Sequence, residues 1–240
     1  MESPSFRLPA LDKDFVLGDS TRGLRFALEY QKAEDALRAA KIRSTIVVFG
    51  SARCAEDSPG DHGRWYQEAR TFAAQASREG GAIDGNGDRH NVIATGGGPG
   101  IMEAANRGAT EVGAPSIGFN ITLPHEQEPN AWSSPELTFR FHYFSVRKFH
   151  LAMRAAALVV FPGGFGTCDE MFEILTLRQT GKMNPLPVVL AMREYWQGVI
   201  NFEAMVKAGV IDRADLDLFS FADDGAGVWR ELQRVGLRRR

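Results

Sequence analysis

Leu158-Val-Val-Phe-Pro-Gly-Gly-Phe-Gly-Thr-Cys-Asp-Glu170 is the stretch that decides the fold. It opens with four apolar residues of the β-branched and aromatic kinds that favour a buried strand. Gly163, Gly164 and Gly166 then permit positive φ angles and leave no Cβ between the backbone and a ligand. Thr167 is predicted to be the N-cap of the helix that follows. A strand, a glycine turn and a helix N-terminus together predict a site for an anion, most often a phosphate.

Glu170 adds a chemical group to this predicted anion site. It lies three positions after Thr167, so the two side chains share one face of the helix, about one turn apart. A carboxylate in that place would lie behind a bound phosphate, where the sugar of a nucleotide would be. The alternative is that Glu170, like Asp169, lies in the first turn of the helix and only balances its dipole.

A second glycine turn follows another strand. Residues 91–95 read as a buried strand, Gly96-Gly-Gly-Pro-Gly100 as a turn, and residues 101–109 as a helix. In a doubly wound sheet such turns gather at the carboxyl ends of the strands, where ligands bind, so Gly97 and Gly98 are candidate contacts. Neither turn has the dinucleotide spacing Gly-x-Gly-x-x-Gly or the lysine of a Walker loop. Ser51, after the strand 45–49, is either a ligand contact or a simple turn serine.

The order of elements predicts the fold class. Strands and helices alternate along the chain, which predicts an α/β protein with a doubly wound, mainly parallel sheet and helices on both faces. Residues 45–240 are expected to form a single domain that binds a nucleotide. Residues 1–44 are expected to be an arm followed by a helix that packs on this core. The packing face of that helix is predicted to be thin and alanine-rich and to run through Leu24, Leu28, Ala33, Ala36, Leu37 and Ala40.

A pair of basic residues precedes the central motif. Residues 145–157 are predicted to form one helix with Ser145 as its cap, which places Arg147 and Lys148 in the first turn, where cations oppose the dipole. Such a placement suggests a function for the two cations. The alternative is that both are solvated surface charges, as most basic side chains are.

Composition and short motifs limit the partners, the cellular location and the cofactors that we expect. The net charge of −2 gives no reason to expect nucleic acid or a membrane as a partner. The longest apolar run, residues 155–161, is too short to span a bilayer, and the first residues lack the order of a signal peptide, so we expect a cytoplasmic protein. Residues 84–88 look like the start of a calcium loop, but Arg89 and Thr95 stand where the loop needs glycine and an acid, so no metal and no cofactor is expected.

Three separated motifs closely resemble the LOG family of cytokinin-activating phosphoribohydrolases. They are the first glycine turn continued by Ile-Met-Glu-Ala104, the pair Arg147-Lys148, and the stretch 162–170. The loop Leu123-Pro-His-Glu-Gln127 is most similar to the longer bacterial branch. The resemblance implies a Rossmann-like fold, cleavage of the N-glycosidic bond of a nucleoside 5′-monophosphate to base and ribose 5-phosphate, and a homodimer or larger homo-oligomer.

The family pattern also assigns roles by motif. It implies Arg147 and Glu170 as catalytic residues, the glycine turn with Thr167 as the phosphate site, and Glu126 as a loop acid in the binding site. We place Lys148 among the binding residues because it adjoins the arginine. Whether Arg147 acts on the base, the ribose or the phosphate stays open, as does the choice between adenine, a prenylated adenine and another purine.

Three other functions are alternatives. The same turns would serve a non-catalytic carrier or sensor of a phosphorylated ligand. Cys168 near a helix N-terminus suggests thiol catalysis, because that position lowers the pKa of a thiol, although the sequence places no histidine as its base. A lysine decarboxylase would need a lysine in a pyridoxal motif, and neither Lys148 nor Lys182 lies in one.

Overall fold

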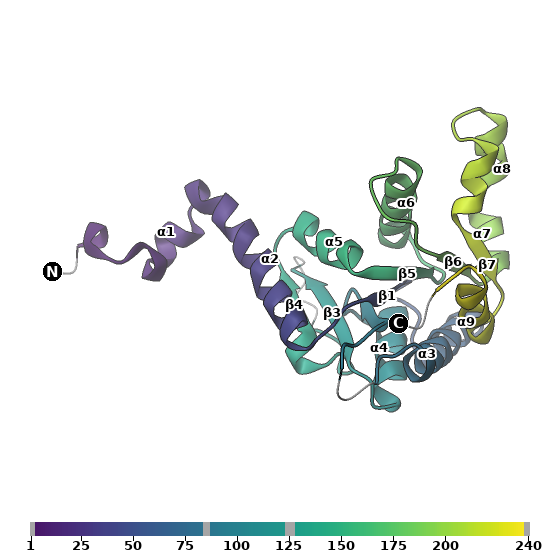
Figure 1. Ribbon diagram of the computed structural model, residues 1–240, viewed down its shortest axis with the longest axis horizontal. Coiled ribbons are helices and arrows are strands. Elements are labelled where there is room, and N and C mark those ends of the chain that lie inside the picture. The colour runs from purple at the N-terminus through teal and green to yellow at the C-terminus, as the bar shows by residue number, and fades with distance from the viewer. Residues whose placement is uncertain (1–2, 84–86, 123–127, 238–240) are drawn as a thin grey trace.

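The computed structural model describes residues 3–83, 87–122 and 128–237. Within these residues, seven strands form one sheet in the order β4-β3-β2-β1-β5-β6-β7, and every neighbouring pair is parallel (Figure 1). The strands are β1 (Thr45–Phe49), β2 (Val92–Thr95), β3 (Ser116–Ile121), β4 (Thr138–Phe141), β5 (Ala155–Val160), β6 (Val188–Ala191) and β7 (Ser220–Ala222).

Helices cover both faces of the sheet (Figure 1). On one face lie α3 (Asp61–Glu79), α4 (Ile101–Glu111) and α9 (Gly225–Arg234), and on the other α2 (Arg22–Ala39), α5 (Phe144–Met153) and α6 (Phe165–Gln179). The short helices α7 (Arg193–Val199) and α8 (Phe202–Lys207) follow β6. The predicted α/β doubly wound fold is confirmed, and the sheet is parallel throughout.

The strand order indicates where a sheet of this kind would bind a ligand. The chain runs outward from β1 to β4 on one side and from β5 to β7 on the other, so the direction of winding reverses between β1 and β5. All five residues of β1 and all four of β6 are buried, as expected for strands covered on both faces. Ligands of such sheets bind outside the carboxyl ends of the strands at the reversal point. The two glycine turns follow β2 and β5, on either side of β1.

The predicted helix over residues 145–157 is wrong at both ends. Its N-cap is Tyr143, so Ser145 is the second helical residue, and the helix ends at Met153. Residues 155–157 belong to β5, where Ala155 pairs with Thr45 and Ala157 with Ile46 of β1. Alanine favours helices when nothing else intervenes, but pairing in the centre of the sheet overrides that preference.

The amino-terminal region consists of an arm and α2. The arm, residues 3–21, forms short helical turns: η1 (Pro4–Phe6), η2 (Pro9–Leu11), α1 (Lys13–Leu17) and η3 (Asp19–Thr21). Of the predicted packing face of α2, Ala33 and Leu37 are buried, whereas Leu24 and Leu28 are 62% and 59% exposed. Only the second half of α2 is therefore packed on the core. None of the described helices is long and apolar enough to cross a membrane.

Candidate active site

Ser51 lies where β1, the turn after β5 and the start of α4 meet. Its backbone N–H donates to the carbonyl of Pro162 at 2.9 Å, and its own carbonyl accepts from the N–H of Ile101 at 3.0 Å. The Ser51 hydroxyl accepts from the N–H of Arg53 at 3.1 Å, which closes a local turn. The structure thus places Ser51 between the two glycine turns, with its main chain joining them.

The helix α6 begins with unpaired backbone donors. Its N-cap is Gly164, whose missing side chain makes no capping hydrogen bond, and its first residues are Phe165, Gly166 and Thr167. The first N–H groups of a helix have no acceptor within the helix, and they carry its positive end. The prediction that Thr167 is the N-cap is wrong, because the helix starts two residues before it. The corrected start leaves the amides of this turn without a serine or threonine cap.

The glycines of this turn differ in what they do for the fold. A Cβ on Gly163 would lie 2.1 Å from Oγ1 of Thr167, so this glycine is needed for the internal packing of a buried threonine. A Cβ on Gly164 or Gly166 would meet nothing within 4 Å, and neither residue has a positive φ angle. The fold itself therefore does not demand glycine at these two positions. Close approach of an external ligand to the backbone would demand it.

The first glycine turn is held by side chains from elsewhere in the chain. The N–H of Gly97 donates to Oγ1 of Thr95 at 2.9 Å, and the carbonyls of Gly97 and Gly98 accept from the backbone N–H and the Nδ2 of Asn130 at 2.9 and 3.0 Å. Gly97 has φ +70°, and a Cβ there would collide with the amide of Asn120. The amide of Gly97 is thus occupied within the protein, which distinguishes this turn from the start of α6.

Arg147 and Glu170 form a buried ion pair across the reversal point. Nη1 of Arg147 lies 3.2 Å from Oε1 of Glu170, and the two residues are only 9% and 7% exposed. Nε of Arg147 donates to the carbonyl of Phe119 at the end of β3, at 2.8 Å. A Cβ on Gly96 would lie 2.6 Å from Nη2 of Arg147, so the guanidinium also packs against the first glycine turn. One arginine thereby connects α5, β3, the first turn and α6.

Glu170 is the sixth residue of α6, so it does not lie in the first turn, which contains no acidic residue. The interpretation that Glu170 balances the helix dipole therefore fails, because that effect is confined to the first turn. Burial raises the pKa of the Glu170 carboxyl above its ordinary value, and the positive charges of Arg147 and Lys148 oppose that rise. The carboxylate is held by neighbouring cations in a place that disfavours charge.

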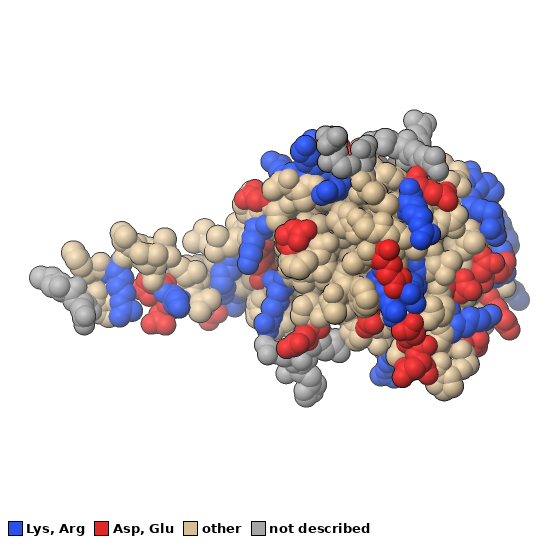
Figure 2. Space-filling view, turned by 90° about the horizontal axis from the view of Figure 1, so that it is seen from below, with Lys and Arg blue, Asp and Glu red and all other residues tan. Residues whose placement is uncertain are grey.

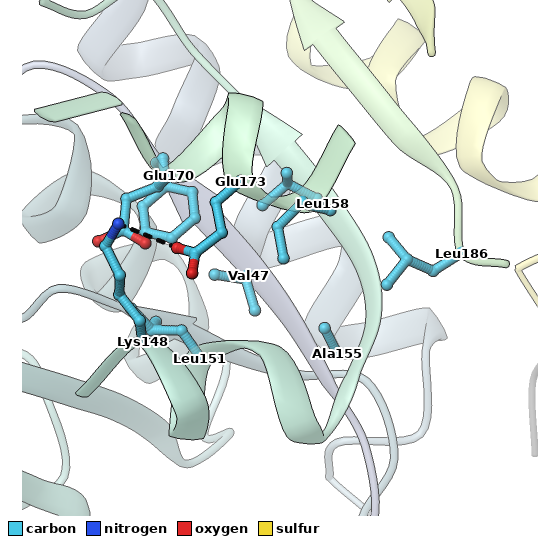
Figure 3. Close-up of a pocket in the computed structure, with 10 residues that line it drawn as sticks. Val47, Lys148, Leu151, Ala155, Leu158, Glu170, Glu173 and Leu186 are labelled. Carbon is cyan, nitrogen blue, oxygen red and sulfur yellow. Dashed lines mark ion pairs between the residues drawn. The ribbon is translucent and has the colours of Figure 1, made fainter. Parts of the chain in front are cut away.

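Lys148 ties α5 to α6 beside this pair. Its Nζ lies 2.8 Å from Asp169 and 3.0 Å from Glu173, and Figure 3 shows it reaching from α5 towards the acids of α6. Burial lowers the pKa of Lys148, but the hydrogen bonds to Asp169 and Glu173 outweigh it, and the net shift is upward. The space between Lys148, Glu170 and the apolar residues below them has a volume of about 10 Å³, enough for one water molecule at most.

The remaining candidate groups from the sequence are the Cys168 thiol, possible metal ligands and Glu126. Burial raises the pKa of the Cys168 thiol, which is the opposite of what a nucleophilic thiolate requires. Among the residues that the structure describes, no group of three or more His, Cys, Asp or Glu side chains is placed to hold a metal ion. Glu126 and residues 84–86 of the calcium-like fragment lie outside the described residues.

Sequence reasoning missed three residues at this site, which are Asn120, Asn130 and Tyr195. Asn130 holds the first glycine turn, and the hydroxyl of Tyr195 donates to the carbonyl of Gly163 at 2.8 Å, which holds the second. Asn120 lies at the end of β3, and its Nδ2 is buried without a hydrogen-bond partner in the described part of the chain. A polar residue at the carboxyl end of a predicted strand was the available signal for Asn120. Nothing local marks Asn130 or Tyr195.

Comparison with known proteins places the chain in a family. The family model described as "Possible lysine decarboxylase" matches residues 102–232, which is more than half of the chain. The probable cytokinin riboside 5′-monophosphate phosphoribohydrolase LOG4 of Oryza sativa subsp. japonica is 26% identical over 145 residues, 59% of this chain and 62% of the relative. A bifunctional cytokinin biosynthesis protein of Fusarium pseudograminearum (strain CS3096) is 34% identical over 80 residues, 32% of this chain and 16% of the relative. The chain therefore spans about three fifths of the first relative and about a sixth of the second.

Solved structures share the fold at low identity. The structural-genomics target TM1055 has a TM-score of 0.56 and 20% identity, with 80% of this chain and 99% of that chain covered. The molybdenum cofactor binding protein of Rippkaea orientalis has a TM-score of 0.53 and 15% identity, with coverage of 80% and 97%. The Moco carrier protein of Chlamydomonas reinhardtii has a TM-score of 0.51 and 23% identity, with the same coverage. These likenesses show a Rossmann-like fold, and the family model together with the curated relatives shows that the chain belongs to the LOG family.

Proposed function

We propose that the protein hydrolyses the N-glycosidic bond of a purine nucleoside 5′-monophosphate, of the AMP or cytokinin type, to the free base and ribose 5-phosphate. The observation that carries this proposal is the buried Arg147–Glu170 pair, which lies within two turns of the uncapped, glycine-lined start of α6. The relative from Oryza sativa, whose described activity is of this kind, supports the same reaction.

The start of α6 is proposed to hold the phosphate. The amides of Phe165, Gly166 and Thr167 point out of the helix and meet no capping side chain from Gly164. The absence of a Cβ at Gly164 and Gly166 leaves the backbone open to a close approach. Binding the phosphate there would anchor the nucleotide at a point remote from the reacting bond and so fix the position of C1′.

Glu170 is proposed to act on the sugar. Breaking the bond between C1′ and the base leaves positive charge on the ribose ring, as in other glycoside hydrolyses. A carboxylate near that charge stabilises it and can orient the attacking water. The water supplies the hydroxyl that joins C1′, and its proton compensates the negative charge that leaves with the base. A buried carboxylate interacts more strongly with such a charge than an exposed one would.

Arg147 is proposed to keep Glu170 ionised and in position. Nε and Nη1 of Arg147 are already committed to the carbonyl of Phe119 and to Glu170. These two bonds leave the second N–H of Nη1 and both N–H groups of Nη2, which packs against Gly96, for a substrate group. We therefore assign Arg147 a positioning role with contacts to the substrate from its free N–H groups, and Lys148 a binding role on the other side of Glu170. The proposed reaction takes place in the cytoplasm and uses no metal or cofactor.

A chromatographic assay tests the proposal. The purified protein is incubated with AMP, isopentenyl-AMP, GMP and adenosine, and released base and ribose 5-phosphate are measured. We expect base from at least one purine monophosphate, and at least about 100-fold less from adenosine, because adenosine lacks the anchoring phosphate. If monophosphates bind but stay intact for hours, the protein is instead a carrier or sensor, the role that the names of two structural neighbours suggest. Equal cleavage of AMP and adenosine would contradict the assignment of the α6 amides.

A further inference from the structure

Asn120 has a side-chain amide that the fold leaves without a partner. The residue lies near the carboxyl end of β3, and its Nδ2 is buried with no hydrogen-bond partner in the described part of the chain. Asn106 and Asn130, which lie beside the same glycine turn, both bond within the protein. A buried donor without a partner is costly and rare, so Asn120 calls for a partner that the fold itself does not supply.

The backbone around this amide leaves room for it. A Cβ on Gly97 would lie 2.3 Å from Nδ2 and 2.5 Å from Oδ1 of Asn120, and a Cβ on Gly118 would lie 3.3 Å from Nδ2. An apolar side chain of the same size would fill this space without leaving a donor unpaired. Packing alone therefore does not explain why an amide stands here.

The amide of Asn120 lies next to the guanidinium of Arg147. The carbonyl of Phe119, the preceding residue, accepts from Nε of Arg147 at 2.8 Å. A Cβ on Gly96 would lie 2.6 Å from Nη2 of Arg147, whereas a Cβ on Gly97 would meet the amide of Asn120. The two side chains thus pack against consecutive residues of the first glycine turn, which places Asn120 at the edge of the candidate active site.

The strand order indicates which end of a nucleotide can reach Asn120. The start of α6, which is proposed to hold the phosphate, follows β5, and β1 and β2 lie between β5 and β3. Three strand spacings amount to about 14 Å, so a phosphate bound at α6 does not touch Asn120. Glu170, which is proposed to act at C1′ of the ribose, reaches from α6 towards Arg147. The part of the nucleotide that remains for Asn120 is the base.

The charged surface offers the base no comparable recognition. On the face that Figure 2 shows, Lys and Arg side chains are interspersed with Asp and Glu, and no large area carries one sign of charge. A surface of this kind attracts an anion only weakly from a distance. Neutral donors and acceptors within the site therefore have to select the base.

We propose that Nδ2 of Asn120 donates a hydrogen bond to a ring nitrogen of the purine, N7 or N3, as the base leaves. This role rests on the proposed hydrolysis of a nucleoside monophosphate. Asn120 as a whole is only half-buried, and the last torsion of an asparagine side chain is broad, so a turn of the amide brings Nδ2 to the substrate.

The hydrogen bond would stabilise the leaving group. When the bond between C1′ and N9 breaks, its electron pair stays with the base, the oxygen of the attacking water joins C1′, and the proton of that water ends on the base. A donor already in place at N7 or N3 stabilises the negative charge that builds up on the ring. The amide keeps both of its protons, so Asn120 assists the departure without acting as an acid.

Paired changes in the protein and in the substrate test this contact. Asn120→Leu, which removes the donor at similar size, is assayed with AMP, 7-deaza-AMP and 3-deaza-AMP. We expect kcat/KM for AMP to fall about 10- to 100-fold. With the analogue that lacks the contacted nitrogen, wild type and variant should differ by less than about 3-fold, because the bond is missing in both. Each substrate is compared only with itself, so the lower reactivity of a deazapurine cancels.

Thermal unfolding separates a role in binding from a role in folding. Asn120→Leu should raise Tm of the free protein by about 2–6 °C, because it removes an unpaired buried donor. Asn106→Leu is the matched control for stability and should lower Tm, since Asn106 bonds to Ile117 and Thr95. Asn120→Asp keeps the shape of the side chain, replaces the donor with an acceptor, and should lose activity on AMP at least as strongly as Asn120→Leu.

Three results would overturn the role of Asn120. They are a full rate of base release by Asn120→Leu, an equal loss on all three substrates, and a fall in Tm for Asn120→Leu like that of Asn106→Leu. A wild-type protein that releases no base from any purine monophosphate would instead overturn the proposed function, and the role of Asn120 with it.

Discussion

Glu170→Gln is the substitution that separates catalysis from folding in this site. It keeps the shape of the side chain and its ability to accept a hydrogen bond from Nη1 of Arg147, which lies 3.2 Å away in the wild type. It removes the negative charge that is proposed to stabilise the ribosyl cation. Losing a positioned carboxylate of this kind lowers kcat by about 10² to 10⁴. We expect a loss in that range for release of adenine from AMP.

The same substitution should cost little stability. Burial raises the pKa of Glu170, so the folded protein holds the charged carboxylate less favourably than the unfolded chain does at neutral pH. A neutral glutamine removes that penalty, although it leaves the buried charge of Arg147 without an opposite charge beside it. These effects oppose each other, so the free energy of unfolding should change by less than about 1.5 kcal/mol, well below the 3–5 kcal/mol of a broken buried pair.

Released adenine, the affinity for AMP and the unfolding curve are measured on the same preparation. Glu173→Gln is the matched control, since Glu173 lies one turn further along α6 and pairs with Lys148 but not with Arg147. It should keep activity within about 10-fold. A Glu170→Gln protein that binds AMP and cleaves it within 10-fold of the wild-type rate would refute the role of Glu170.

Four further predictions follow from the same contacts. Activity should fall on the acid side with a midpoint above the ordinary pKa of a glutamate, because burial raises the pKa of Glu170. Arg147→Met should move that midpoint to still higher pH, since it removes the positive charge that opposes the rise in the pKa of Glu170, and an unchanged midpoint would contradict the pairing. Gly166→Ala should leave stability unchanged or raise it by up to about 1 kcal/mol, and it should weaken AMP binding. Gly163→Ala should instead destabilise the fold by about 1–3 kcal/mol through its contact with Thr167. Equal changes of stability and of AMP affinity in the two variants would argue against a phosphate at α6. Glu34 is buried between Arg154 and Arg38, and the hydrogen bond from Arg154 lowers the pKa of Glu34 from 4.5 to about 2. The ionised Glu34 therefore stabilises the fold above about pH 4.5, and that stability is lost as the pH falls towards 2. Glu34→Gln should cost about 3 kcal/mol at neutral pH, against less than about 1 kcal/mol for Glu203→Gln, which changes an exposed pair with Arg213. Cys168→Ser should keep activity within a few-fold, and a complete loss would restore thiol catalysis as a mechanism.

The elements that could be predicted are those whose pattern is local. The strand at residues 45–49 was predicted with the bounds that the structure has, because its buried β-branched run ends at a glycine. The helix predicted at residues 101–109 begins at Ile101, directly after the glycine turn, as expected. The two glycine turns and the strand–turn–helix order likewise depend on neighbouring residues, and they were enough for the fold class.

The failures share one physical cause, which is competition from distant residues. Residues 155–157 would suit a helix, but pairing with β1 draws them into the sheet. Thr167 would suit an N-cap, but the helix begins at Phe165 and the threonine packs against Gly163. Arg147 and Glu170 are far apart in sequence, so only the folded chain shows them 3.2 Å apart.

The most direct test of the central claim is a crystal structure of the Glu170→Gln protein with AMP bound. The account predicts the phosphate within hydrogen-bond distance of the amides of Phe165, Gly166 and Thr167, with C1′ of the ribose against the side chain at position 170. A phosphate bound at the first glycine turn, or a ribose whose C1′ faces away from position 170, would contradict it.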